Sequence, residues 1–185
     1  MSSDSHSAAG HVFWLFGLSG AGKTTLANRL ASELRRRGTG VLSLDGDVLR
    51  ASLCHGLGFS EADRAENLRR AACVARIALE SSLTVIAAFI TPMESHREVV
   101  RSLLPPDGLS LIHVDAPIDV CQSRDVKGLY ARAKAGGVSQ MTGVSAAFER
   151  PVHADLVLST GRESIDQSAE RLAGFARQKL SRTSR

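Results

Sequence analysis

The chain has 185 residues, and 43% of them are hydrophobic, which fits one globular domain with a sizeable buried core. Its formal charge is +4, but Lys and Arg are spread along the chain and aromatic residues make up only 4%, so no nucleic-acid partner is expected. No stretch approaches the roughly 20 apolar residues of a membrane span, which argues against a membrane partner. The three cysteines have neither paired nor metal-like spacing, so we expect reduced thiols and a cytoplasmic location.

Along the chain, short apolar runs alternate with longer helical patterns. The apolar runs are residues 12–16, 41–44, 83–89, 109–115 and 155–159. Runs of this length are typical of strands that helices cover on both faces. The pattern therefore predicts an α/β fold of three layers, with a central, mainly parallel sheet of about five strands. We expect one domain over residues 12–180, preceded by a flexible tail of residues 1–11 and followed by a short tail of residues 181–185.

The first apolar run leads into GLSGAGKTT, which matches the phosphate-loop pattern GxxxxGK[ST]. Glycines let the backbone wrap around a phosphate with its N–H groups pointing inward, because a Cβ would obstruct that approach. Lys23 is expected to reach the β- and γ-phosphates, and the Thr24 hydroxyl to ligate Mg²⁺. The predicted nucleotide-binding residues are Gly17, Leu18, Ser19, Gly20, Ala21, Gly22, Lys23, Thr24 and Thr25. The motif predicts a P-loop fold that binds a nucleoside triphosphate, but it does not tell where the phosphate goes.

The second apolar run ends in DGDVLR, which places Asp45 and Asp47 at the carboxyl edge of the sheet, beside the phosphate loop. Two carboxylates separated by one residue can serve an acceptor hydroxyl, because one accepts its proton while the other orients it and the waters of the metal. Arg50 follows where it could meet an anionic acceptor. A turn with a helix cap is the alternative interpretation of the two aspartates.

Two later segments are candidates for the acceptor side of the site. In GFSEADRAENLRR, Ser60 and Asp63 form a capping-box-like start, and Arg64 and Asn67 lie along one edge of the apolar stripe that follows. A solvated helix face would also explain Arg64 and Asn67. Residues 124–143 are polar, contain glycine and are rich in Lys and Arg, so we expect them to form a lid.

Taken together, GLSGAGKTT, LDGDVLR, GFSEADRAENLRR, AAFITP, VDAP followed by CQSRDVKGLYARAKAG, and MTG resemble the adenylyl-sulfate kinase family over residues 16–160. The resemblance implies a P-loop kinase that transfers the γ-phosphate of ATP to the 3′-hydroxyl of adenosine 5′-phosphosulfate. It also implies Mg²⁺ as cofactor, a small-molecule nucleotide as acceptor and a homodimer.

Carried over position by position, the resemblance implies the site residues. The expected catalytic residues are Lys23, Asp45, Asp47 and Thr91, with Thr24 as the metal ligand and Arg124 facing the donor nucleotide. The expected acceptor-binding residues are Asp45, Asp47, Arg50, Phe59, Arg64, Asn67, Ile90, Thr91, Lys127 and Met141. Phe59 would stack on the acceptor base, and Lys127 would belong to the closing lid. Thr91 stands where the family has a serine and keeps a hydroxyl, but direct in-line attack needs no covalent step through it, so we treat Thr91 as a contact residue.

The departures from the family pattern all fall on the acceptor side. Met141 replaces a phenylalanine that closes the second face of the acceptor base, Met93 replaces a tyrosine, and Val48 replaces an asparagine. A divergent member that phosphorylates another nucleoside 5′-derivative, such as a cytidine compound, or a small hydroxylated metabolite fits the same residues. A nucleotide-binding module without transfer is the third hypothesis, but such a protein would be expected to have lost Lys23, Asp45 or the basic residues of the lid, and all are present.

Overall fold

The computed structural model describes residues 10–125, 128–134 and 142–183, and a five-stranded sheet runs through its centre. The strands are β1 (Val12–Phe16), β2 (Val41–Asp45), β3 (Thr84–Phe89), β4 (Leu109–Asp115) and β5 (Leu156–Ser159). They lie in the order β2-β3-β1-β4-β5, and every pairing between neighbours is parallel. The expected parallel sheet of about five strands is confirmed.

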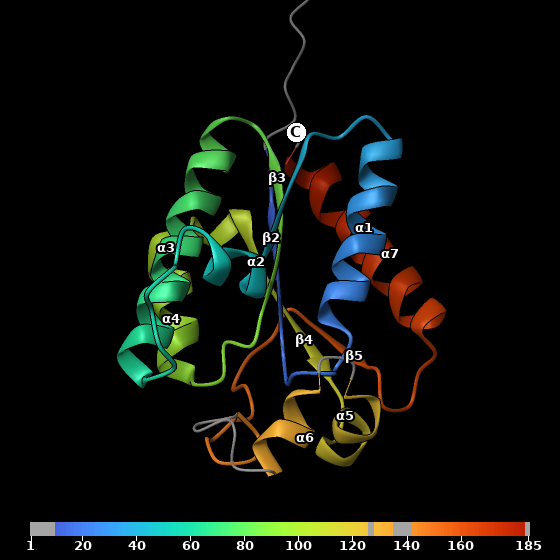
Figure 1. Cartoon of the computed structure of the whole chain (residues 1–185). Coiled ribbons are helices and arrows are strands. Elements are labelled where there is room, and N and C mark those ends of the chain that lie inside the picture. Colours follow the sequence, from blue (N-terminus) through green and yellow to red (C-terminus); the bar gives the residue numbers. More distant parts are fainter. Residues whose placement is uncertain (1–9, 126–127, 135–141, 184–185) are drawn as a thin grey trace, which may run out of the picture.

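Helices cover both faces of the sheet. They are α1 (Lys23–Arg36), α2 (Gly46–Ala51), α3 (Glu61–Glu80), α4 (Glu94–Leu103), α5 (Ile118–Arg124), α6 (Leu129–Lys134) and α7 (Ile165–Thr183), with a short 3-10 helix at Pro106–Gly108. Helices α3 and α4 pack together on one face, and α1 and α7 pack together on the other, while α5 and α6 lie at the lower end of the molecule (Figure 1). The expected three-layer arrangement is therefore confirmed.

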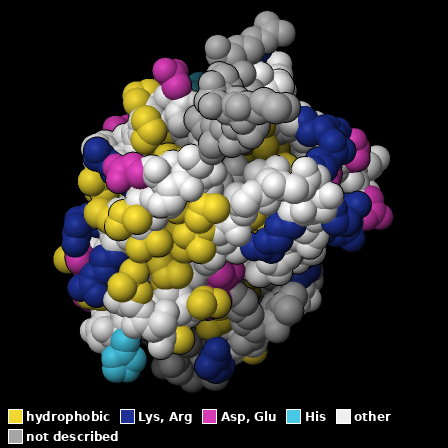
Figure 2. All heavy atoms as spheres, turned by 90° about the horizontal axis from the view of Figure 1, so that it is seen from above, with side chains coloured by type: hydrophobic (Ala, Val, Ile, Leu, Met, Phe, Trp, Pro, Cys, Tyr) yellow, Lys and Arg dark blue, Asp and Glu magenta, His cyan; other side chains and the backbone are white. Residues whose placement is uncertain are grey.

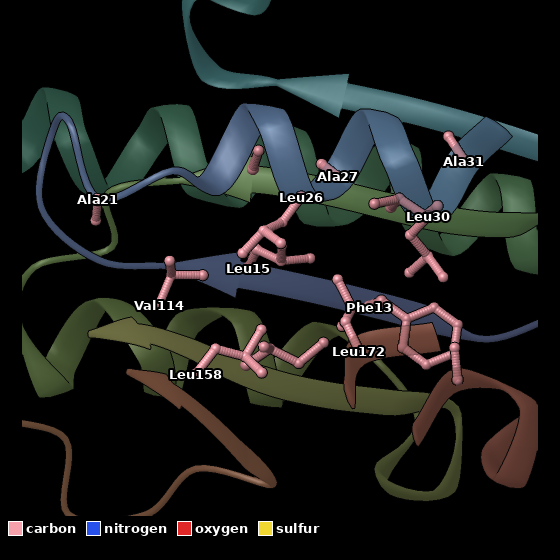
Figure 3. Close-up of a cluster of buried hydrophobic side chains, with 14 of the residues drawn as sticks. Phe13, Leu15, Ala21, Leu26, Ala27, Leu30, Ala31, Val114, Leu158 and Leu172 are labelled. Atoms are coloured by element: carbon pink, nitrogen blue, oxygen red, sulfur yellow. The ribbon is translucent and has the colours of Figure 1, made fainter. Parts of the chain in front are cut away.

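The central strand β1 explains why its sequence is apolar throughout. Successive side chains of a strand point to opposite faces. Phe13 and Leu15 pack among Leu26 and Leu30 of α1 on one face, as Figure 3 shows, and all of β1 is buried. The other three side chains of β1 belong to the second cluster, between the sheet and α3 and α4. Because both faces are covered, neither set of side chains can be polar without a buried partner.

The ends of the folded region differ from the expected boundaries. Gly10 and His11, assigned to the N-terminal tail from sequence, are buried, and His11 Nε2 lies 2.9 Å from Ser110 Oγ on β4. A Cβ at Gly10 would lie 2.1 Å from the carbonyl oxygen of Leu83, so this position needs a glycine. Helix α7 continues to Thr183, three residues beyond the expected end of the domain at residue 180.

Two surface properties bear on the expected partners. Among the described residues, none of the helices combines the length and the apolar character that a bilayer crossing needs. On the face shown in Figure 2, hydrophobic side chains occupy the middle, and Lys and Arg gather in separate groups next to Asp and Glu. That face therefore lacks the continuous basic stripe that nucleic-acid binding uses.

We expect His11 to make folding sensitive to acid. Burial, together with the charge of Lys179 and against the charge of Asp155, lowers the pKa of His11 to about 4, whereas the unfolded chain has the ordinary value of 6.5. Between these values the unfolded chain binds a proton that the folded protein does not, so the free energy of unfolding falls as the pH drops. Through His11 alone, the free energy of unfolding should fall by about 2 kcal/mol between pH 7.5 and pH 5.

Urea unfolding of the wild type and His11→Gln at both pH values measures this loss. The variant should lose less stability between pH 7.5 and pH 5, by about 2 kcal/mol. His153→Gln, at an exposed histidine, is the control and should follow the wild type. Equal acid sensitivity in wild type and His11→Gln would contradict the assignment.

Candidate active site

The phosphate loop, residues 17–22, connects the carboxyl end of β1 to the first turn of α1. Two of its glycines are required by the fold. Gly17 has φ +148°, and a Cβ there would lie 2.3 Å from the carbonyl oxygen of Val114. Gly20 has φ +79°, and its Cβ would lie 2.8 Å from the carbonyl oxygen of Cys121. The loop is therefore pressed against β4 and α5, and only glycine fits that close approach.

Side chains hold every carbonyl oxygen of this loop from residue 17 to residue 21. The donors are Lys23 Nζ to Gly17 (2.9 Å) and Leu18 (2.7 Å), Tyr130 Oη to Ser19 (2.9 Å), Arg124 to Gly20 (3.4 Å) and Thr160 Oγ1 to Ala21 (2.8 Å). The carbonyl oxygens of the loop are therefore satisfied, while the N–H groups of Gly17 and Ala21 donate to the carbonyl oxygens of Ile90 and Leu18.

Two of these donors were not predicted from the sequence. Tyr130 lies on α6, within the segment expected to be a lid, and is the only tyrosine of the chain. Thr160 follows β5 directly, at the same edge of the sheet as the phosphate loop. This position after a strand is the one feature of the sequence that could have pointed to a contact between Thr160 and the loop. Arg124 was expected to face the donor nucleotide, but in the structure its guanidinium donates to Gly20 and to the carbonyl oxygen of Thr160 (2.7 Å).

Asp45 is a helix cap, as the alternative interpretation has it, and it also contacts the phosphate-loop helix. It is the N-cap of α2, because its Oδ1 accepts a hydrogen bond from the N–H of Asp47 at 2.9 Å. Its Oδ2 accepts a hydrogen bond from the Thr24 hydroxyl at 2.8 Å, across the gap between β2 and the phosphate loop. Asp47 is exposed on the first turn of α2. The structure therefore brings Asp45 and Thr24 together at the position where a metal bound to a triphosphate would lie.

A cavity of about 290 Å³, called the donor cavity here, joins these groups. Its lining includes Lys23, Thr24, Asp45, Asp47, Ile90, Asp125 and Leu129. Among the described residues, no three His, Cys, Asp or Glu side chains gather as a metal cage. Mg²⁺ normally takes one or two protein oxygens together with phosphate and water oxygens, so a hydroxyl beside a carboxylate fits it.

Two guanidinium groups lie close to the ring of Phe59. Arg50 lies 4.5 Å and Arg64 5.6 Å from the ring centroid, and 54% of Phe59 is exposed. Arg50 donates to the carbonyl oxygen of Gly58 at 2.8 Å, and Arg64 Nε to that of Phe59 at 2.9 Å. Burial lowers the pKa of both guanidiniums, and the charge of Arg50 lowers that of Arg64 further. Two cations held side by side in this way favour an anionic ligand.

A second cavity of about 300 Å³, called the acceptor cavity here, lies between α3 and α4. Its lining includes Phe59, Arg64, Pro92, Met93, His96 and Thr142. Arg64 also donates to the Thr142 hydroxyl at 3.1 Å. The loop from Ile90 to Met93 contributes to both cavities, since Ile90 lines the donor cavity.

The loop between the two cavities is held in a strained conformation. Thr91 has φ +44°, which a β-branched residue rarely adopts, and it is buried. Its Oγ1 accepts a hydrogen bond from Trp14 Nε1 at 3.0 Å, so Trp14 supports the site as well as the core. The neighbouring carbonyl of Ile90 accepts the N–H of Gly17 at 3.2 Å, which ties this loop to the phosphate loop.

Arg97, which the sequence analysis did not single out, fixes the other side of the same loop. It is fully buried and donates to the carbonyl oxygens of Pro92 (3.0 Å) and Glu149 (2.6 Å) and to Glu94 Oε2 (2.6 Å). Its guanidinium also lies 4.9 Å from the ring centroid of Phe16. A buried arginine is paired almost by necessity, but its partners here could not be read from the sequence.

Several predicted site residues remain apart from the two cavities. Arg50 and Asn67 stand close to the acceptor cavity in sequence but do not contribute to its lining. Asn67 is buried, and its Oδ1 has no hydrogen-bond partner among the described residues. Val48, one of the departures from the family pattern, points into solvent. Lys127 and Met141 lie outside the described residues.

Comparison with known proteins adds independent information. The protein-family model described as "Adenylylsulphate kinase" matches residues 9–159. The chain is 47% identical over 165 residues to the adenylyl-sulfate kinase of Paraburkholderia xenovorans (strain LB400), covering 89% of this chain and 92% of that protein. The APS kinase CysC of Mycobacterium tuberculosis, solved in complex with AMPPNP and APS, superposes with a TM-score of 0.86 at 37% identity, over 91% of this chain and 98% of that one. A hexameric APS kinase from Thiobacillus denitrificans gives a TM-score of 0.68 at 29% identity, over 98% of this chain and 31% of that one.

The hydrogen bond from Tyr130 to the phosphate loop should contribute to nucleotide affinity. Tyr130→Phe removes the donor to Ser19 and leaves the ring in place. We expect a loss of about 1 kcal/mol, or about fivefold in the dissociation constant for ATP measured by calorimetry. Burial raises the pKa of Tyr130 to about 12, so the hydroxyl remains a donor and the effect should be constant from pH 7 to pH 9.

Ser123→Ala is the matched control for Tyr130→Phe. The Ser123 hydroxyl donates to Val120 within its own helix, α5, so its loss removes a hydroxyl close by without touching the phosphate loop. If Tyr130→Phe binds ATP as tightly as the wild type does, the hydrogen bond from Tyr130 to Ser19 does not support the loop.

Proposed function

The chain belongs to the adenylylsulphate kinase family, and we propose that it transfers the γ-phosphate of ATP to the 3′-hydroxyl of adenosine 5′-phosphosulfate. One observation carries the proposal: the loop from Ile90 to Met93 lines both the donor cavity and the acceptor cavity. A kinase needs two adjacent sites, because the reacting oxygen and phosphorus must be held in contact for in-line transfer. A nucleotide switch needs only the site that binds the nucleotide.

On the donor side, the phosphate loop binds the triphosphate of ATP. The N–H groups at the N-terminus of α1 hold the phosphate oxygens, and Lys23 exchanges its contacts with Gly17 and Leu18 for the β- and γ-phosphates. Mg²⁺, when bound, neutralises charge that develops on the phosphate oxygens, and the Thr24 hydroxyl would hold it. Asp45, already bonded to Thr24, is placed to orient the waters of the metal.

On the acceptor side, Phe59 offers its exposed ring to a base, and Arg50 and Arg64 bind the anionic phosphosulfate. We assign no acceptor contact to Asn67, because it is buried and lies outside the lining of the acceptor cavity. Pro92 and Met93 line the acceptor cavity. Thr91, next to them in the chain, is buried and accepts a hydrogen bond from Trp14, so it acts by positioning this loop.

The transfer itself is a displacement at the γ-phosphorus. The 3′-oxygen of the acceptor forms the new P–O bond, the bond between the γ-phosphorus and the bridging oxygen breaks, and ADP leaves. Asp45 takes or relays the proton of the hydroxyl, and Asp47 orients that hydroxyl. Closure of the segment 124–143, with Lys127 and Arg124, excludes water so that ATP is not hydrolysed instead. Asp125 and Leu129 of this segment already line the donor cavity, which supports that role.

We further propose that the protein acts in the cytoplasm as a homodimer. The cytoplasmic location is supported by three cysteines that are all unpaired. The association of like chains is supported by the family, one relative of which is described as hexameric. Sedimentation equilibrium of the purified protein gives the number of copies.

Turnover with a panel of acceptors tests the proposed substrate. ADP release from Mg·ATP is measured with adenosine 5′-phosphosulfate, with other nucleoside 5′-phosphates and diphosphates including cytidine compounds, and without acceptor. We expect fast turnover with adenosine 5′-phosphosulfate and only slow release without acceptor. Turnover with another nucleotide alone would mean that the changes at Val48, Met93 and Met141 have re-specified the acceptor.

Two substitutions separate binding from transfer. Lys23→Ala should abolish transfer, because it removes the ammonium group that neutralises charge on the β- and γ-phosphates. Asp45→Asn should reduce turnover by orders of magnitude while ATP binding stays largely intact, since Asn keeps an oxygen that can cap α2 but cannot accept the proton. Single-turnover rates and ATP dissociation constants are the measurements. Turnover of Asp45→Asn close to that of the wild type would remove Asp45 from the role given to it.

A further inference from the structure

The acceptor cavity contains a histidine that the proposed mechanism does not use. His96, on α4, lines this cavity together with Phe59, Pro92 and Met93. The neighbouring walls are an exposed aromatic ring, a proline and a thioether, all of which suit the flat face of a base. The imidazole thus stands where the edge of that base would lie.

His96 is 2% exposed, and neither Nδ1 nor Nε2 meets full hydrogen-bonding geometry with another described group. The backbone of Glu61 is the one hydrogen-bonding group of the described chain that acts on the imidazole, so at least one ring nitrogen is left for a ligand. Leaving a buried polar atom unsatisfied destabilises a protein by about 1–3 kcal/mol. A group that fills the cavity can supply the missing partner, because the ring torsion of a histidine is soft and can turn a nitrogen toward the ligand.

The surroundings of His96 favour the neutral imidazole. Burial lowers its pKa, a backbone hydrogen bond and the charge of Glu61 oppose that shift, and the charges of Arg64 and Arg97 add to it. A neutral imidazole has one donor and one acceptor nitrogen, whereas an imidazolium has two donors. An edge that offers N–H groups and ring nitrogens, as adenine does, is complementary to the neutral form.

We propose that His96 is a specificity-determining residue that accepts a hydrogen bond from the exocyclic amino group of the acceptor's adenine. This inference rests on the proposed function. An anionic group is a poorer match for His96, because Arg50 and Arg64 already supply two cations to that ligand and a third beside Arg97 would be repelled. His96 therefore contacts the base and leaves the phosphosulfate to the arginines.

The test compares two acceptors that differ only at the amino group. Dissociation constants and kcat/KM are measured for adenosine 5′-phosphosulfate and for the purine riboside analogue that has hydrogen in place of the amino group. The wild type should bind the amino compound about 10-fold more tightly. In His96→Leu the ratio should fall to about one, and His96→Gln, which keeps an acceptor, should retain part of it.

His153→Leu, at an exposed histidine, is the matched control and should keep the ratio of the wild type. ATP dissociation constants verify that each variant is folded. If His96→Leu is not folded, the ratio of the two dissociation constants in the wild type and in His96→Gln still tests the inference. A wild-type ratio of about one, or a ratio unchanged in a folded His96 variant, overturns the inference.

The dependence of acceptor binding on pH gives a second readout. Protonation removes the acceptor nitrogen, so the affinity of the wild type for adenosine 5′-phosphosulfate should fall on acidification, at a pH below the ordinary histidine value because the pKa of His96 is lowered, and less so in His96→Gln. Affinity that rises on acidification would place His96 on the phosphosulfate and overturn the inference. Binding without turnover would reject the proposed function alone, because the ratio of dissociation constants still tests His96.

Discussion

The peptide carbonyls of residues 17–21 must all find donors, and the rest of the site depends on this constraint. Five successive carbonyls without partners would be unfavourable. The donors are side chains from four separate places: Lys23 at the start of α1, Arg124 on α5, Tyr130 on α6 and Thr160 after β5. Arg124, Tyr130 and Thr160 hold residues 19–21 without Lys23, so this part of the loop keeps its donors when Lys23 turns to a triphosphate.

The same donors connect nucleotide binding to the segment that covers the site. Arg124 and Tyr130 belong to α5 and α6, and Asp125 between them accepts the backbone N–H groups of Tyr130 and Ala131. A movement of this segment must therefore change the contacts of the phosphate loop. On the opposite side, the loop from Ile90 to Met93 is fixed by Trp14, Gly17 and Arg97, so the acceptor meets a wall that is rigidly joined to the donor site.

Sequence reasoning brought residues together in the right place where the pattern is local. The phosphate loop and Asp45 each follow a strand in one short motif, and parallel strands bring their carboxyl ends to one edge whatever the loops do. The contacts of Tyr130, Thr160 and Arg97 were not predicted. Tyr130 bonds a residue 111 positions away and Thr160 one 139 positions away, and no local pattern carries such a pairing. The tail boundaries failed for a similar reason, because His11 is buried by Ser110 on a distant strand.

By itself, the sequence determined the class of fold, the phosphate loop and the set of charged groups that a phosphate transfer needs, because these depend on residue order and on the period of apolar residues. Only the tertiary structure decided which side chains hold the carbonyls of the loop, that Asp45 is both a helix cap and a partner of Thr24, and that one loop lines two cavities. These properties depend on distances between residues far apart in the chain, and such distances are set by the packing of helices against the sheet.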